Sequence, residues 1–242
     1  MIRGILILIE ILFLILVSIF AIPIIYIIDK FNKALSQKFS QSLVYFFASL
    51  TIFICGTEVE IIGRENLPDE PCLYISNHRG YFDIIISMTF IRKRTFYVAK
   101  KSIGKIPLLH FYMIKMGCLL IDRDDIKQSL GVILKSIDQV NDGFSCYIYP
   151  EGTRTSSPDH EMLPFKEGSF KISTKTNVPI CPITILHTRD IYERQAPRFK
   201  KAKVIFIIDK PVYPNDLSPE DKKFIGKYCQ NIVENNIKKY LD

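Results

Sequence analysis

The chain has 242 residues and a net charge of +7, from 32 basic and 25 acidic side chains, and 48% of its residues are hydrophobic. This composition, without low complexity or an internal repeat, excludes a disordered chain and a repeat protein. The positive charge fits an anionic partner such as a phospholipid surface or a phosphorylated substrate. Nucleic acid ranks last among such partners, because no nucleic-acid-binding motif accompanies the basic residues, and we expect no nucleic-acid partner.

Six cysteines lie at positions 55, 72, 118, 146, 181 and 229. None of them forms a CxxC pair or has metal-ligand spacing with a histidine, so we expect no metal site. Most lie in apolar, strand-like runs, where a free cysteine behaves as a small buried hydrophobe. Buried free thiols suit a reducing compartment, which predicts that the catalytic part faces the cytosol.

The N-terminal segment from Ile5 to Ile28 predicts a membrane helix. Its only charge is Glu10 and its only helix breaker is Pro23. As a helix this segment reaches about 36 Å, enough to cross a hydrocarbon core of about 30 Å. A signal peptide is the competing interpretation, but its apolar core would be shorter and a small-residue cleavage site would follow it.

A second apolar patch runs from Leu43 to Cys55 and is too short to span a bilayer comfortably. It predicts either the second arm of a helical hairpin or an ordinary core helix. Three lysines lie between the two patches and one arginine precedes them: Lys30, Lys33, Lys38 and Arg3. Under the positive-inside rule, a single span would place the C-terminal bulk in the cytoplasm, and re-entrant insertion from the cytoplasmic face would also leave it there. We expect membrane-associated helices in residues 1–56 and an α/β domain in residues 57–242.

From position 57 onward, short β-branched or aromatic runs alternate with longer helical patterns. The predicted strands are Glu58–Ile62, Cys72–Ser76, Thr95–Ala99, Cys118–Ile121, Ser145–Tyr149, Ile180–Leu186 and Lys203–Ile208. The predicted helices are Phe82–Ile91, Pro107–Lys115, Ile126–Val140 and a C-terminal segment from Phe224 to Leu241. This alternation predicts an α/β fold with a mixed, mostly buried sheet of about seven strands flanked by helices.

The segment NHRGYFD, residues 77–83, follows a predicted strand and opens a predicted helix. A histidine held by a carboxylate can act as a general base, because the carboxylate fixes the tautomer and stabilises the imidazolium. Residues five apart on a regular helix point about 140° apart, so His78 must lie in the turn before the helix if it contacts Asp83. The alternative is that His78 is an ordinary loop residue and Asp83 a first-turn acid favoured by the helix dipole.

Two further segments place charged residues directly after predicted strands. In GCLLIDR, residues 117–123, an acid and a base follow a buried strand, and a solvated turn with a weak surface pair is the alternative. In YPEGTRT, residues 149–155, Gly152 lets the backbone approach a ligand closely and Arg154 offers a planar fork suited to phosphate. Glu151 could accept a hydrogen bond from a ligand hydroxyl or position Arg154, and the alternative is a turn with an exposed ion pair.

The segment VPICPI, residues 178–183, is almost wholly apolar and predicts core or the wall of an apolar channel. A separate run of basic residues without an intervening acid occupies positions 92–105: Arg92, Lys93, Arg94, Lys100, Lys101 and Lys105. This run is either a solvated face or a site of attraction to anionic lipid heads, where each basic residue contributes about 1 kcal/mol.

Taken in this order, the four segments resemble the glycerolipid acyltransferase family, and within it the 1-acylglycerol-3-phosphate acyltransferases. NHRGYFD is similar to the family's NHxSxxD, and GCLLIDR to its glycine, apolar residues and I-D-R. YPEGTRT resembles FPEGTRS, and VPICPI resembles V-P-I-x-P-V. The resemblance extends from Thr57 to Leu186. Gly80 stands where the family usually has serine, which removes a hydroxyl near the expected base.

The resemblance implies transfer of a fatty acyl group from a thioester to the sn-2 hydroxyl of 1-acylglycerol 3-phosphate, which forms phosphatidic acid. His78 would deprotonate that hydroxyl, Asp83 would hold His78, and no acyl-enzyme would form. The implied substrate-binding residues come from the second and third motifs and from two lysines: Arg123, Glu151, Gly152, Thr153, Arg154, Lys100 and Lys105. The implied partners are a phospholipid membrane, a lysophospholipid and an acyl donor on coenzyme A or acyl carrier protein, without a metal or organic cofactor.

Three other interpretations stay open. The nearest is an acyltransferase that acts on another lyso-lipid or on glycerol 3-phosphate. The second is a non-catalytic, membrane-bound lipid-binding protein of the same fold, against which the intact His78 and Asp83 pair argues. The third is a metal phosphohydrolase, which would need further histidine and aspartate ligands. The other three histidines lack acidic partners at motif spacing, which argues against it.

Overall fold

The computed structural model describes residues 2–91 and 94–241 and contains a seven-stranded sheet in the order β1-β7-β6-β2-β5-β3-β4. The strands are β1 (Glu58–Ile62), β2 (Leu73–Ser76), β3 (Thr95–Lys100), β4 (Leu119–Ile121), β5 (Ser145–Ile148), β6 (Ile180–Leu186) and β7 (Lys203–Ile208). Neighbouring strands are parallel except at the β6–β7 junction, which is antiparallel. The predicted mixed sheet is confirmed.

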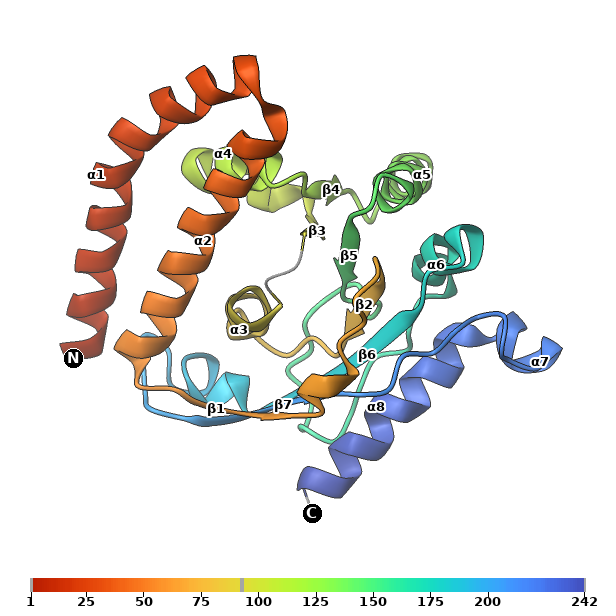
Figure 1. The fold of residues 1–242 in the computed structure, drawn as a ribbon. Helices are drawn as coiled ribbons and strands as arrows, with labels where there is room; N and C mark the ends of the chain where they lie inside the picture. The colour runs from red at the N-terminus through yellow and green to blue at the C-terminus, as the bar shows by residue number, and fades with distance from the viewer. Residues whose placement is uncertain (1, 92–93, 242) are drawn as a thin grey trace.

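Helices cover both faces of the sheet (Figure 1). One face carries α2 (Lys33–Cys55), α3 (Phe82–Phe90) and α4 (Pro107–Lys115), and the other carries α5 (Ile126–Asn141), α6 (Lys171–Thr176) and α8 (Ile225–Leu241). The short helix α7 (Pro219–Lys223) precedes α8. Short 3-10 turns join these elements: η1 (Arg64–Asn66), η2 (Lys101–Lys105), η3 (Glu167–Phe170), η4 (Thr188–Asp190) and η5 (Glu193–Gln195).

Alternate side chains of the central strands belong to the two layers. Tyr74 on β2 and Tyr147 on β5 pack in the layer of α2 and α3, whereas Leu73 and Cys146 pack in the layer of α5 and α8. All four side chains are fully buried. Because strands of a covered parallel sheet are buried on both faces, they are almost continuously apolar in the sequence, which made them predictable.

The N-terminal helix α1 (Ile2–Phe31) and α2 form a hairpin (Figure 1). Asn32 begins α2, and its side chain accepts a hydrogen bond from the Leu35 N–H at 3.0 Å. The helix starts well before the predicted apolar patch, because its polar first half also packs on the domain: Gln37 donates to the Met116 carbonyl at 3.0 Å. The second patch is therefore the end of a hairpin arm, and its Ile52 lies in the core beneath the sheet.

Most large apolar side chains of α1 are exposed, including Leu12 and Phe20. Both α1 and α2 are long and apolar enough to cross a membrane, with mean hydropathies of 3.2 and 1.4. Apolar surface of this extent is unfavourable in water. The hairpin is consistent with a membrane anchor.

The carboxyl ends of five strands meet at one edge of the sheet, because β2, β3, β4, β5 and β6 run parallel to one another. Ligand sites in open α/β sheets form at this edge. It carries His78 after β2, Glu151 after β5 and Thr188 after β6. The first three motif segments therefore converge there, whereas the fourth, residues 178–183, leads into β6 at the opposite edge.

Candidate active site

His78 lies in the turn between β2 and α3, and Asp83 lies in the first turn of α3. The two are joined by a contact of 2.9 Å between His78 Nδ1 and Asp83 Oδ2, and Asp83 is fully buried. A carboxylate accepts hydrogen bonds, so Nδ1 carries the proton and Nε2 keeps its lone pair. The turn thus brings the pair together in the way that the five-residue spacing requires, and Nε2 is the ring atom able to act as a base.

Asp83 has three hydrogen-bond donors besides His78. Its Oδ2 accepts the backbone N–H groups of Arg79 at 2.5 Å and Gly80 at 2.8 Å. Its Oδ1 accepts the hydroxyl of Thr188 at 2.5 Å. These donors satisfy the buried carboxylate and fix its direction toward the imidazole.

Glu151 connects the third motif to the first. Its Oε1 accepts the backbone N–H of His78 at 2.6 Å, and its Oε2 accepts that of Leu163 at 3.0 Å. Burial raises the pKa of the Glu151 carboxyl to about 7, although both hydrogen bonds and the nearby Arg79 favour the charged form. Both oxygens of this predicted substrate contact are thus engaged by backbone donors, and Glu151 holds the backbone of the residue expected to be the base.

The imidazole of His78 stacks on Tyr149, with ring centroids 4.1 Å apart and 25° between the planes. Burial raises the pKa of the Tyr149 phenol well above its usual value, so the ring is neutral. Stacking fixes the plane of the imidazole while the bond to Asp83 fixes its rotation. Sequence reasoning assigned Tyr149 no role, because only the pairing of β2 with β5 places it beside His78.

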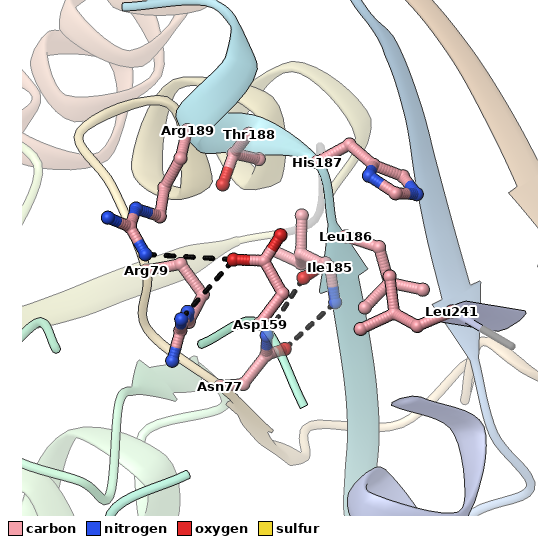
Figure 2. A pocket seen from close by; sticks show the side chains of 9 residues that line it. All are labelled: Asn77, Arg79, Asp159, Ile185, Leu186, His187, Thr188, Arg189 and Leu241. Carbon is pink, nitrogen blue, oxygen red and sulfur yellow. Dashed lines mark hydrogen bonds and ion pairs between the residues drawn. The ribbon is translucent and has the colours of Figure 1, made fainter. Parts of the chain in front are cut away.

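Asn77 anchors the base-bearing turn to β6. Its amide donates to the Ile185 carbonyl and accepts from the Ile185 N–H, both at 2.8 Å (Figure 2). The side chain thereby continues the pairing of β2 with β6 beyond Ser76, where the backbone of the turn departs. Asn77, the first residue of the NHRGYFD segment, therefore has a structural role.

Arg79 holds the loop that follows the third motif. Its guanidinium is buried and donates to the carbonyls of Ser157, Pro158 at 3.0 Å and Glu161 at 2.7 Å. Arg79 and Arg189 both approach Asp159 in Figure 2, at 3.3 and 3.6 Å. Arg194 from η5 also pairs with Asp159, at 2.5 Å. The sequence held no signal for this cluster, since its members come from three separate segments.

A groove of about 330 Å³ opens between α5 and the carboxyl ends of β3, β4 and β5. Three cations line it: Arg123, Lys166 and Lys171. Its apolar wall consists of Val98, Ile121, Ile126, Leu130, Ile133 and Ile148. Burial lowers the pKa of the Arg123 guanidinium, which an anionic partner would offset. Gly152 lines the same groove with φ of 77°, and a Cβ there would lie 2.8 Å from Lys166 Nζ. An apolar groove with cations suits an amphiphile with an anionic head.

Arg154 lies outside the lining of this groove. Its guanidinium stacks over the ring of Tyr81, 3.8 Å from the centroid, directly before α3. Arg154 and the neighbouring Thr153 are both exposed. The structure therefore places Arg154 against the turn that carries His78, and Arg123 and Gly152 at the groove.

The two predicted lysines lie on the surface. Lys100 ends β3 and Lys105 ends η2, and both side chains are exposed. Between them, Lys101 pairs with Asp122 at 3.1 Å. Among the described residues, no hydrogen bond or ion pair joins either predicted lysine to His78. The first two members of the basic run, residues 92 and 93, lie outside the described residues.

Within residues 2–91 and 94–241, no group of three or more His, Cys, Asp or Glu side chains is arranged to hold a metal ion. The six cysteines form no disulfide and are buried. Burial raises the pKa of the Cys118 thiol to about 12, which keeps it protonated and unreactive. The thiols are therefore parts of the apolar core.

Comparison with known proteins gives a match to the family model described as "Acyltransferase" over residues 58–186, more than half of the chain. Among curated relatives, the chloroplastic 1-acyl-sn-glycerol-3-phosphate acyltransferase BAT2 of Brassica napus is 32% identical over 194 residues. A 1-acyl-sn-glycerol-3-phosphate acyltransferase of Saccharomyces cerevisiae is 28% identical over 178 residues. These matches cover 79% and 73% of this chain, which spans only 54% and 58% of the two relatives' lengths.

Among solved structures, the 1-acyl-sn-glycerophosphate acyltransferase PlsC of Thermotoga maritima aligns with a TM-score of 0.77. The alignment covers 98% of this chain and 96% of that chain, with 24% sequence identity. At that identity the likeness shows a shared fold. It confirms the predicted α/β architecture over nearly the whole length.

Proposed function

The chain belongs to the acyltransferase family, and from that premise we propose that it acylates the sn-2 hydroxyl of 1-acylglycerol 3-phosphate to form phosphatidic acid. The single observation that carries the proposal is the 2.9 Å contact between His78 Nδ1 and Asp83 Oδ2. That contact gives a base at the edge of the sheet where ligands bind. The names of the Brassica and yeast relatives support the choice of acceptor.

The mechanism needs no nucleophilic side chain. His78 Nε2 takes the proton of the acceptor hydroxyl, and the alkoxide oxygen attacks the carbonyl carbon of the acyl thioester. The new C–O bond forms, the C–S bond breaks, and the departing thiolate takes the proton from the imidazolium. Asp83 stabilises the imidazolium between these two proton transfers, as a buried carboxylate does in other histidine-based sites.

Two arginines are the proposed contacts of the acceptor's phosphate. Arg154 and Arg123 each present a planar guanidinium that can donate two parallel hydrogen bonds to one phosphate. Gly152 permits close backbone approach at the groove beside the exposed Thr153, and Glu151 holds the backbone of His78. Lys100 and Lys105 contribute positive charge near the surface, where anionic lipids concentrate.

The hairpin of α1 and α2 supports a membrane location, where a lysophospholipid resides. We place the catalytic domain on the cytoplasmic face, because a hairpin that enters the membrane from that face returns the chain to it, and six buried cysteines without disulfides suit a reducing compartment. On that face an acyl donor on coenzyme A or on acyl carrier protein reaches the site from solution. The proposed steps use neither a metal nor an organic cofactor.

The test uses the purified full-length protein in detergent with a panel of lyso-lipids, glycerol 3-phosphate and both donor types. Products are identified by mass, with His78→Ala as the inactive reference. We expect phosphatidic acid from 1-acylglycerol 3-phosphate with the wild type alone. Product from a different acceptor only would move the protein to a sibling activity, and absence of product with every pair would contradict catalysis.

A further inference from the structure

Four successive backbone N–H groups in the turn after β2 are each held by a carboxylate. The N–H of His78 is bound by Glu151 and those of residues 79 and 80 by Asp83. The fourth, that of Tyr81, donates to Glu193 Oε1 at 2.6 Å, across 112 residues of sequence. Glu151 and Asp83 belong to the motif segments, whereas Glu193 comes from η5 and belongs to none of them.

The carboxylate of Glu193 fills the space beside Gly80. A Cβ built on Gly80 would lie 2.7 Å from Oε1 and 2.9 Å from both Cδ and Oε2 of Glu193. The φ of Gly80 is outside the left-handed region, so its backbone would accept any residue. The carboxylate, and not the backbone, is therefore what a side chain at position 80 would displace. A serine, which the sequence resemblance leads one to expect, would meet the same atoms.

The second oxygen of Glu193 supports a fixed placement. Oε2 is buried and has no hydrogen-bond partner among the described residues. A carboxylate free to move would turn this oxygen to water, because leaving it unpaired is unfavourable. The contacts with Tyr81 and Gly80 thus hold the group in place.

Tyr81 links Glu193 to both functional ends of the site. Its backbone begins α3, whose first turn carries Asp83, and its ring supports the guanidinium of Arg154 at 3.8 Å. Tyr81 occupies the N-cap position of α3, but its side chain makes no capping hydrogen bond. The hydrogen bond that Tyr81 donates to Glu193 therefore fixes the residue that connects the expected base to the expected phosphate contact.

We propose that Glu193 is a positioning residue for the acyl transfer, and that Gly80 and Glu193 act as one coupled pair. The inference rests on the proposed function, since His78 and Arg154 take their roles from it. Glu193 acts through Tyr81 and touches neither substrate. Its loss changes the placement of the base relative to the phosphate contact.

The experiment compares Glu193→Ala, Gly80→Ala and the double variant in steady-state kinetics. Glu193→Ala should lower kcat roughly tenfold and raise the acceptor KM, because a charge-assisted hydrogen bond that orients the site is removed. Gly80→Ala should have the same effect, because its methyl group displaces the carboxylate from Tyr81. The double variant should be no worse than either single one, whereas independent effects would multiply to about a hundredfold.

Glu193→Gln is the conservative variant, because its amide oxygen can still accept from Tyr81, and it should keep most of the activity. Gly131→Ala is the matched glycine control, since its added Cβ meets nothing within 4 Å beyond its chain neighbours and the adjacent backbone of its own helix. Glu220→Ala, at an exposed position on α7, is the matched acid control. Both controls should keep the kinetic constants of the wild type, although Gly131→Ala should raise the unfolding midpoint because alanine favours the helix interior.

Thermal unfolding midpoints of the same variants give a readout that does not need activity, and they too should be non-additive. An inactive wild type would defeat the proposed function while leaving this coupling measurable. An active wild type with multiplicative effects in the double variant, or with full activity in Glu193→Ala, would overturn the coupled pair.

Discussion

Thr188 donates its hydroxyl to Asp83 Oδ1 at 2.5 Å, across 105 residues of sequence. The bond joins the first residues after β6 to the first turn of α3, and it depends on the pairing of β2 with β6. Thr188 is itself almost fully buried. The orientation of the Asp83 carboxylate toward His78 therefore depends on β6, a strand that contains no charged residue.

Replacement of Thr188 by valine removes this donor and keeps the side chain's shape. We expect a fall in kcat of about tenfold. A hydrogen bond to a buried charged group is worth about 1.5–3 kcal/mol, and the part of this free energy that orients the carboxylate is lost from the transition state. Thr188→Ser keeps the hydroxyl and should stay close to the wild type. Thr176→Val on α6 is the matched control. Equal activities of the serine and valine variants would show that the hydroxyl is not needed.

Removal of the base should be much more severe. His78→Ala is expected to lower turnover by about 10² to 10⁴, the usual contribution of a general base, with little change in the unfolding midpoint. Asp83→Asn should also be severe, because an amide cannot accept from all of the donors that surround this position. His160→Ala, at an exposed position, serves as the control. Near-normal turnover in a folded His78→Ala protein would remove the mechanism.

The central strands were predictable because burial on both faces leaves apolar runs, whereas the edge strand β1 was predicted from its β-branched Val59, Ile61 and Ile62. The strands β1, β6 and β7 begin and end where the pattern placed them. The start of α2 was not predictable from hydropathy, since its first residues are polar. They are helical because Asn32 caps them and Gln37 bonds to Met116, and the second of these contacts exists only in the folded chain.

The site divides in the same way. The contact of His78 with Asp83 followed from local spacing, because both lie within one turn and the start of one helix. Thr188 and Glu193 reach the same turn from segments more than a hundred residues away. Their positions follow from strand order, which single-sequence patterns do not specify. Its place two residues after the buried strand β6 was the signal in the sequence for Thr188.

Acceptor binding should depend on the planar guanidinium of Arg154 and not on its charge alone. Arg154→Lys keeps the charge but loses the planar fork, so the acceptor KM should rise, and Arg154→Ala should raise it further. Tyr81→Leu removes the ring under the guanidinium and should give a smaller rise in the same constant. The donor KM should change much less in each case. Arg64→Lys, on η1, is the control. A selective change in the donor constant would show that Arg154 contacts the donor.

Glu151 makes stability depend on pH. Burial raises the pKa of its carboxyl from 4.5 to about 7, so the folded protein binds a proton that the unfolded chain does not. The stabilisation is fully present below pH 4.5 and is lost as the pH rises through about 7, a change of about 3 kcal/mol.

The measurement compares unfolding midpoints of the wild type and Glu151→Gln in detergent from acidic to neutral pH. As the pH rises, the wild type should lose stability relative to the variant, which carries no titrating group there. Glu220→Gln should follow the wild type throughout. Parallel curves for the wild type and Glu151→Gln would show that Glu151 does not titrate in this range.

The membrane anchor can be tested without disturbing the packing of the hairpin. Leu12 and Phe20 are 58% and 67% exposed, whereas Ala21 and Ile25 on the same helix pack in a cluster with Tyr112. A double change to lysine, Leu12→Lys with Phe20→Lys, places charge on the outer face alone. Each charge near the middle of a membrane helix is unfavourable by about 2.5–3.5 kcal/mol.

The charged double variant should therefore move from the membrane fraction toward the soluble or aggregated fraction, with its unfolding midpoint in detergent unchanged. Deleting residues 2–31 should do the same but also uncover the packed face of α2, so aggregation should be greater. Lysines introduced at Asn141 and Asn215, far along the chain from the hairpin, control for added charge. If the full-length wild type partitions into the soluble fraction without detergent, or the double variant stays in membranes at the wild-type level, the exposed face of α1 does not contact lipid.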